Sequence, residues 1–256
     1  MKVGILAGGL GTRLAEETLV KPKPMVEIGG KPIIWHIMRS FADYGCREFV
    51  IALGYKGEMI KDYFINYRKR TCSLTVKLST GDLLVHNGHT EDWTVHLLDT
   101  GAKTQTGGRV KRIAEYIGNE PFLLTYGDGV SNVNIDELLE FHKSHGKIAT
   151  ITAVRPPARF GDLVFKGENV ESFSEKAQTA GGWINGGFFV LEPEIVNYID
   201  SSDTSFESSP MERLTRENQL MAYRHHDFWQ CMDTLRDVQL LEKMWDSGNV
   251  PWRLKP

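Results

Sequence analysis

The chain begins with an apolar run that ends in glycines. Val3–Leu6 contains no polar side chain, which predicts a strand buried on both faces of a sheet. Positions 33–44 carry apolar residues at helical spacing with Gly45 as the cap, and Phe49–Leu53 is a second uniformly apolar run. A second helix is expected at 58–67. This strand–helix–strand–helix order predicts parallel strands joined by right-handed crossovers.

The remaining segments extend the same pattern. The stretch from Leu74 to Asp99 alternates and contains the hairpin-type dipeptide Asn87-Gly88, which predicts β structure outside the simple repeat. Further strands are expected at 122–126, 149–154 and 183–191, and further helices at 108–116, 136–145, 210–217 and 234–246. We therefore predict an α/β fold: a Rossmann-like mixed, mostly parallel sheet with helices on both faces and β insertions.

Composition and charge narrow the class of protein. The chain has 256 residues, 41% of them hydrophobic, and no linker-like tract divides it, so we expect a single domain over 1–256. A net charge of −3 gives no basic field for nucleic acid or an anionic membrane. The three scattered cysteines indicate reduced thiols. With no signal-peptide pattern and no apolar run near ~18 residues, a cytoplasmic protein without a membrane partner is expected.

Candidate chemistry starts where the first strand ends. Gly8, Gly9 and Gly11 allow a tight turn and let main-chain N–H groups approach a phosphate without a Cβ in the way. Arg13 and Lys23 add positive charge to the same region. The segment therefore predicts binding of a polyanion, with a nucleoside triphosphate as the first choice. The alternative is a glycine-rich turn of a parallel sheet.

Two common phosphate-binding motifs do not fit this segment. Leu14 stands where a dinucleotide fingerprint needs its third glycine, and no Gly-Lys-Ser/Thr closes a Walker A loop. The second strand ends in the basic stretch Leu53–Lys56 instead of an acidic residue, which argues against an NAD-dependent oxidoreductase. The Lys-Pro-Lys-Pro stretch at 21–24 has a structural alternative as a stiff exposed turn.

Two carboxylates are candidate ligands for Mg²⁺. Asp128 ends a predicted strand between two glycines, and Asp233 precedes the last predicted helix. Two carboxylates together with triphosphate oxygens form the ligand set that Mg²⁺ prefers. An aspartate in either place is also a common turn former or helix N-cap, and only the fold could bring the two together.

Three weaker motifs complete the candidate site. The glycines and arginine of 104–109 precede a predicted helix, where they could hold a base edge or phosphate or simply cap the helix. Asn185-Gly186-Gly187 interrupts a predicted strand, which indicates a bulge or a close approach of a ligand. Glu175-Lys176 is, taken alone, a solvated surface pair.

The run from Leu6 to Leu14, followed by Lys21–Pro24, resembles the signature of the sugar-phosphate nucleotidyltransferases. Over residues 1 to about 253 the chain looks like the glucose-1-phosphate cytidylyltransferase family, and the further segments that carry this resemblance are Asp99–Gly101, Thr106–Arg112, Thr125–Gly129, Ile184–Phe189 and Trp229–Thr234. The resemblance implies that CTP and α-D-glucose 1-phosphate are converted to CDP-glucose and pyrophosphate with Mg²⁺, as the first step toward CDP-deoxysugars of bacterial surface polysaccharides. It also implies a homo-oligomer, a hexamer.

The resemblance assigns roles to residues of this chain. It implies a mainly nucleotide-binding half, 1–135, and a mainly sugar-phosphate-binding half with the C-terminal helix, 136–256. Nucleotide contacts are expected from Leu6, Ala7, Gly8, Gly9, Gly11, Thr12, Arg13, Lys23, Thr104, Gly108, Arg109, Gly127 and Asp128. Sugar-phosphate contacts are expected from Glu175, Lys176, Asn185 and Gly186, with Ala177 in place of the family's proline, and metal binding from Asp128 and Asp233.

The expected mechanism is in-line attack of the sugar phosphate on the α-phosphorus. The nucleophile is already an anion, so the protein has to position two polyanions and stabilise developing charge. Arg13, Lys23 and Asp128 are the expected catalytic residues. Two alternatives stay open: a transferase of the same fold with another nucleotide or acceptor, and an inactive nucleotide-binding regulatory protein.

Overall fold

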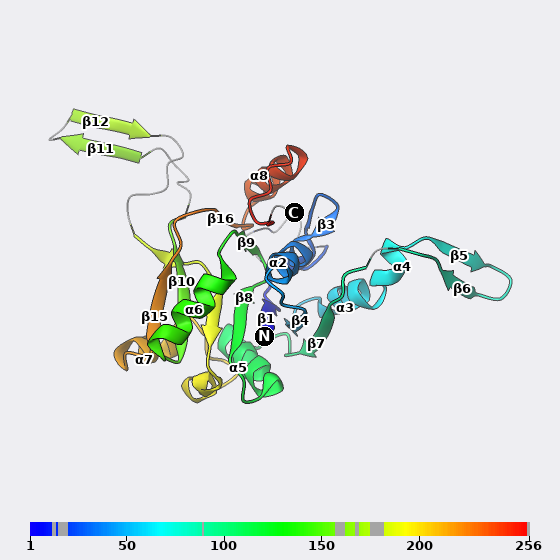
Figure 1. Cartoon of the computed structure of the whole chain (residues 1–256), viewed down its shortest axis with the longest axis horizontal. Coiled ribbons are helices and arrows are strands. Elements are labelled where there is room, and N and C mark those ends of the chain that lie inside the picture. Colours follow the sequence, from blue (N-terminus) through cyan, green and yellow to red (C-terminus); the bar gives the residue numbers. More distant parts are fainter. Residues whose placement is uncertain are drawn as a thin grey trace.

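A mixed β-sheet forms the centre of the computed structural model, which describes residues 1–11, 14, 20–88, 90–156, 162–166, 169–174 and 182–254 (Figure 1). Its strands are β1 (Lys2–Ala7), β4 (Glu48–Leu53), β7 (Thr94–Asp99), β8 (Phe122–Tyr126), β10 (Ala149–Val154), β13 (Ile184–Asn185), β14 (Phe189–Leu191) and β15 (Leu220–Arg224). They lie in the order β13-β10-β14-β8-β1-β4-β7, and β15 pairs with β10.

Strand direction confirms the predicted mostly parallel sheet. β8, β1, β4 and β7 run parallel to one another, whereas β14 is antiparallel to both β8 and β10. Side chains alternate between two apolar clusters, with Ile5 of β1 in one and Leu6 in the other. Both faces of the central strands are therefore buried, as their uniformly apolar sequence requires.

Helices cover both faces of the sheet (Figure 1). Side chains of α2, α3, α6 and α8 belong to one apolar cluster, and those of α5, α7 and the 3-10 helix η3 belong to the other. The helix bounds are α2 (Ile33–Ala42), α3 (Gly57–Ile65), α4 (Tyr67–Thr71), α5 (Thr106–Ile117), α6 (Ile135–His145), α7 (Ser209–Arg216), α8 (Leu235–Asp246), η2 (Lys23–Met25) and η3 (Pro193–Tyr198).

In the described part of the chain, four small β-ribbons complete the architecture. They pair β2 (Glu27–Ile28) with β3 (Lys31–Pro32), β5 (Leu74–Lys77) with β6 (Asp82–Val85), β9 (Gly129–Ser131) with β16 (Trp229–Cys231), and β11 (Asp162–Lys166) with β12 (Asn169–Ser174). The β5–β6 and β11–β12 ribbons project from opposite ends of the molecule (Figure 1). The β9–β16 ribbon lies in the body and shapes the site described below.

Three predictions about elements were wrong in detail. The hairpin turn lies between β5 and β6, with Gly81 at φ +75°, and not at Asn87-Gly88. β7, expected outside the repeat, is a parallel edge strand of the main sheet. The strand expected at 183–191 is broken into β13 and β14, because residues 186–188 leave the extended conformation and Phe188 has φ +48°.

The helix expected at 58–67 is also divided, into α3 and α4 at Asn66. None of the helices in the described part of the chain has the length and apolar character that a membrane span requires.

Candidate active site

A pocket of about 730 Å³ opens at the carboxyl ends of β1 and β8. Ligands of open α/β sheets bind at this edge. Its lining residues include several predicted nucleotide-binding positions: Leu6, Ala7, Gly8, Gly9, Gly11, Lys23, Thr104, Arg109, Gly127 and Asp128. Asp233 lines the same pocket. The structure therefore brings these residues together from the two predicted halves of the chain.

The buried side chain of Arg109 binds the backbone of the glycine segment. Arg109, only 4% exposed, donates to the carbonyl oxygens of Gly8 (3.1 Å) and Leu53 (2.8 Å) and to the hydroxyl of Thr100. A Cβ at Gly8 would overlap the guanidinium. Arg109 thus ties the end of β1 to the end of β4. Its predicted contact with a base edge or phosphate stays a prediction beside this supporting role.

Lys23 lies in η2 and faces the pocket from a buried position. Pro22 and Pro24 flank it, Met25 N donates to the Pro22 carbonyl, and the Lys23 side chain is 9% exposed. The alternative of a stiff exposed turn is therefore wrong: the two prolines shape a short buried turn that aims the ammonium group into the site.

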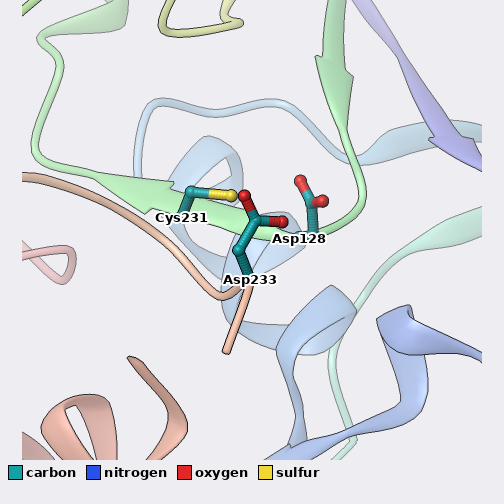
Figure 2. Close-up of side chains that lie close together, drawn as sticks. All are labelled: Asp128, Cys231 and Asp233. Atoms are coloured by element: carbon teal, nitrogen blue, oxygen red, sulfur yellow. The ribbon is translucent and has the colours of Figure 1, made fainter. Parts of the chain in front are cut away.

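The β9–β16 ribbon brings the two aspartates together. Gly129 pairs with Cys231, and Met232 N donates to the Asp128 carbonyl at 2.8 Å. As a result, oxygen atoms of Asp128 and Asp233 and the Cys231 sulfur all lie within 4.8 Å of one another, and the side chains converge on one point (Figure 2). Residues 105 positions apart in the chain thus form one cluster.

The Lys23 ammonium lies between these carboxylates. Its Nζ is 2.6 Å from Asp128 Oδ2 and 2.5 Å from Asp233 Oδ1. Burial alone would lower the pKa of Lys23, but the charge of Asp128 and the hydrogen bonds to both carboxylates raise that pKa above its usual value. Burial and the charge of Asp128 raise the pKa of the Cys231 thiol. The cluster is therefore a site for positive charge.

The structure removes the helix-cap alternative for Asp233. The N-cap of α8 is Thr234, whose hydroxyl accepts from Asp237 N, while the Asp237 carboxylate accepts from Thr234 N at 2.8 Å. Asp237 also accepts from Asp233 N at 3.0 Å. This capping box fixes the backbone of Asp233 and leaves its carboxylate directed toward the pocket.

The glycines before α5 have a packing reason. Gly107 N donates to the Thr204 carbonyl at 3.0 Å, and a Cβ at Gly107 or Gly108 would lie 2.6–2.8 Å from backbone atoms of Ser202 or Thr204. The N-terminus of α5 is thus covered by the 199–208 loop. The expected nucleotide contact of Gly108 stays a prediction.

The Asn185 segment reaches the pocket through a neighbour. Asn185 Nδ2 donates to the Tyr126 hydroxyl at 3.0 Å, and its Oδ1 accepts from Gly187 N at 2.8 Å. The Gly186 carbonyl accepts from Trp229 Nε1 at 2.8 Å. These bonds connect the interrupted strand both to β8 and to the β9–β16 ribbon, which lies next to the metal candidates.

Four predicted site residues, Thr12, Arg13, Glu175 and Lys176, lie outside the described residues, as does Ala177. Sequence reasoning missed Tyr126 and Cys231 as parts of the site. Tyr126 lines the pocket, and Cys231 belongs, with Asp128 and Asp233, to the group that we call the cation cluster. Their proximity depends on strand pairing, although the position of Tyr126 two residues before Asp128 was a usable signal.

The model of the nucleotidyl transferase family matches residues 2–246. The chain is 52% identical over 254 residues to a glucose-1-phosphate cytidylyltransferase of Salmonella typhimurium, with 99% of each chain covered. It is 44% identical over 255 residues to a probable glucose-1-phosphate cytidylyltransferase of Bacillus subtilis, with 99% of this chain and 100% of that protein covered.

Solved structures show the same architecture. HddC from Yersinia pseudotuberculosis is similar with a TM-score of 0.70 at 25% identity, covering 95% of this chain and 99% of that one. A UDP-glucose pyrophosphorylase complexed with UDP-glucose has a TM-score of 0.68 at 15% identity, covering 96% of this chain and 98% of that one. The sheet is therefore of the nucleotide-diphospho-sugar transferase type, as the sequence predicted.

Proposed function

The chain belongs to the nucleotidyl transferase family, and from this premise we propose that it joins CTP and α-D-glucose 1-phosphate to give CDP-glucose and pyrophosphate. The full-length similarity to glucose-1-phosphate cytidylyltransferases supports the choice of substrates. The observation that carries the chemistry is the Lys23 ammonium between Asp128 and Asp233 at the edge of the glycine-lined pocket. It combines groups for a polyphosphate and for a cation in one place.

The cation cluster fits Mg²⁺ as the cofactor. Asp128 and Asp233 offer carboxylate oxygens, the hard ligands that Mg²⁺ prefers, and an ammonium group already occupies the space between them as a stand-in cation. When bound, Mg²⁺ would neutralise charge on the reacting phosphates. Cys231, a soft donor, does not contribute to that preference.

The residues of this chain would act by position and charge. The Gly8–Gly11 segment would lie along the phosphates, and Arg109 would keep its backbone in place. Lys23 would hold a phosphate oxygen of the nucleotide as a point charge. For Arg13, Glu175 and Lys176, all outside the described residues, the roles expected from the resemblance stay part of the proposal. No general base is needed because the attacking phosphate is already an anion.

The Lys23 ammonium group contacts the same carboxylates that would hold the cation. Asp128 and Asp233 would hold Mg²⁺ through the carboxylates that the Lys23 ammonium group contacts, and two like charges repel each other strongly at such a site. We infer that the Lys23 ammonium group would move from these carboxylates to a phosphate oxygen of the nucleotide when Asp128 and Asp233 hold a cation. The triphosphate would compensate the charge of the displaced ammonium group.

Asp128→Asn tests the assignment. We expect the rate of CDP-glucose formation to fall by about 10²–10³-fold, the effect of losing one contact that stabilises transition-state charge. Chromatography and mass spectrometry of the product measure this rate. Asp246→Asn neutralises an exposed carboxylate at the end of α8 and serves as the matched control. Near-normal product formation by a folded Asp128→Asn variant would refute the role of the cluster.

The oligomer expected from the resemblance remains a proposal, with size-exclusion chromatography coupled to light scattering as its measurement. Supporting it, the projecting β5–β6 ribbon exposes the apolar side chains Leu74, Val76, Leu83 and Leu84. The cytoplasmic location and the division into two functional halves likewise stay predictions.

A further inference from the structure

Glu207 lies behind two residues that line the pocket. Its Oε1 accepts from the Tyr126 hydroxyl at 2.7 Å, and its Oε2 accepts from the Thr106 hydroxyl at 2.6 Å and from Ser205 Oγ at 2.8 Å. Tyr126 stands at the end of β8, two residues before Asp128, whereas Thr106 begins α5. One carboxylate therefore links the end of β8 to the start of α5, both of which line the pocket.

The segment that carries Glu207 is firmly anchored. The preceding residue, Phe206, is fully buried, and its ring packs edge-to-face against Phe189 at a centroid distance of 5.6 Å. Phe206 N also donates to Thr106 Oγ1 at 2.9 Å. Although Glu207 itself is exposed, its backbone is fixed, so its carboxylate can hold other groups in place.

Tyr126 depends on Glu207 for its orientation. The ring lies against Gly187, where a Cβ would come within 3.1 Å, and packs edge-to-face against Phe189. Its hydroxyl donates to Glu207 and accepts from Asn185 Nδ2, so both hydrogen-bonding roles are used and the ring forms the pocket wall.

The two sides of the pocket do not depend on Glu207 equally. Near Thr106, the loop and α5 are also joined by backbone bonds from Gln105 N to Ser202 O (2.8 Å) and from Gly107 N to Thr204 O (3.0 Å). On the other side, the described structure links Glu207 to Asn185 through the Tyr126 hydroxyl. Removal of the carboxylate would therefore loosen the Tyr126–Asn185 side and leave the start of α5 in place.

We propose that Glu207 is a positioning residue that holds Tyr126 and, through it, Asn185 for the sugar phosphate. The inference rests on the proposed function, because it assigns the Asn185 side of the pocket to the acceptor. Glu207 touches neither reacting group; it acts through the tyrosine.

Steady-state kinetics of Glu207→Ala tests the proposal. We expect KM for the sugar phosphate to rise about tenfold, the effect of losing one hydrogen bond to a charged group, while KM for CTP stays within about twofold. Glu207→Gln keeps one acceptor oxygen and should recover part of the loss. Glu217→Ala, which removes the partner of the Tyr198 hydroxyl at 2.6 Å, is the matched control and should leave both KM values unchanged.

A double-mutant cycle separates positioning from general loosening. If Glu207 acts through Tyr126, Tyr126→Phe combined with Glu207→Ala should lose no more than Glu207→Ala alone. Additive losses, an unchanged acceptor KM, or an equal rise in both KM values would overturn the proposal. The acceptor is the sugar phosphate that the wild type uses, so a wild type that prefers another acceptor refutes the proposed substrate and not the positioning role.

Discussion

The position of the Lys23 ammonium group between the two carboxylates can be tested through the metal affinity of the nucleotide-free protein. Because its ammonium occupies the space between Asp128 and Asp233, Lys23→Met should let Mn²⁺ bind without nucleotide. We expect an affinity about 5- to 150-fold above that of the wild type, the usual range of coupling between two binding events. Electron paramagnetic resonance of free Mn²⁺ measures this directly. Equally tight Mn²⁺ binding by the nucleotide-free wild type would contradict the proposed exchange.

Gly8 and Gly9 form a natural pair of test positions. A Cβ at Gly8 would overlap the Arg109 guanidinium, whereas a Cβ at Gly9 would meet no atom within 4 Å. Gly8→Ala should therefore cost roughly 1–3 kcal/mol of the free energy of unfolding, as other overpacked sites do. Gly9→Ala should change it little. Urea denaturation of both variants measures these free energies of unfolding. Equal losses in the two variants would argue against the packing of Arg109 on this turn.

Some residues of the site could be predicted from the sequence, but the contacts of others could not. Gly8, Lys23 and Asp128 stand out locally, because a glycine turn, a proline-flanked lysine and an aspartate after an apolar strand each point to chemistry. The hydrogen bonds of Arg109 and Glu207 could not be predicted. The bond from Arg109 to Gly8 and the bond from Tyr126 to Glu207 join positions 101 and 81 residues apart, and only the packed sheet brings such positions together.

The capping box at the start of α8 stabilises the helix and also holds the backbone of Asp233 in place. Thr234→Ala removes the side-chain cap and should cost about 1 kcal/mol of the free energy of unfolding, within the range of about 0.5–2 kcal/mol for lost caps. Ser208→Ala is the control, because Ser208 is the N-cap of α7 but makes no side-chain cap bond. Chemical denaturation compares the two. A smaller loss for Thr234→Ala than for Ser208→Ala would show that the cap is not stabilising.

Apolar runs predicted the long elements well and the short ones poorly. β8 and β10 have the predicted bounds, β1 is longer than predicted by one residue at each end, and β4 is longer by one residue at its start. The three-residue strands β9 and β16 had no periodic signal, since such short strands are defined by their pairing alone. This ribbon is what joins Asp128 to Asp233, so the metal candidates could be predicted as residues but not as a site.

A buried histidine joins the N-terminal and C-terminal parts of the chain. His36 is fully buried among Trp35, Trp245 and Trp252; its Nε2 lies 2.8 Å from the Ile28 carbonyl, and its Nδ1 accepts from Trp252 Nε1. Burial lowers the pKa of His36 from 6.5 to about 4. The neutral ring is thus the stable form in the folded protein.

This histidine predicts how stability depends on pH. Between pH 6.5 and about 4 the unfolded chain binds a proton at His36 that the folded protein does not, so stability is complete above pH 6.5 and falls as the pH drops. The loss attributable to His36 should reach about 3 kcal/mol. In urea unfolding, His36→Gln should show a shallower pH dependence than the wild type. His86→Gln, on the β5–β6 ribbon, should match the wild type, and three identical slopes would contradict the prediction.

Pyrophosphate release with Mg²⁺ and α-D-glucose 1-phosphate, measured in parallel with CTP, UTP, dTTP, ATP and GTP, tests the proposed reaction most directly. We predict release with CTP alone and CDP-glucose as the second product. Faster release with another nucleotide would contradict the cytidylyl assignment while keeping the chemistry of Lys23, Asp128 and Asp233. No release with any of the five, from folded protein, would contradict the proposed reaction itself.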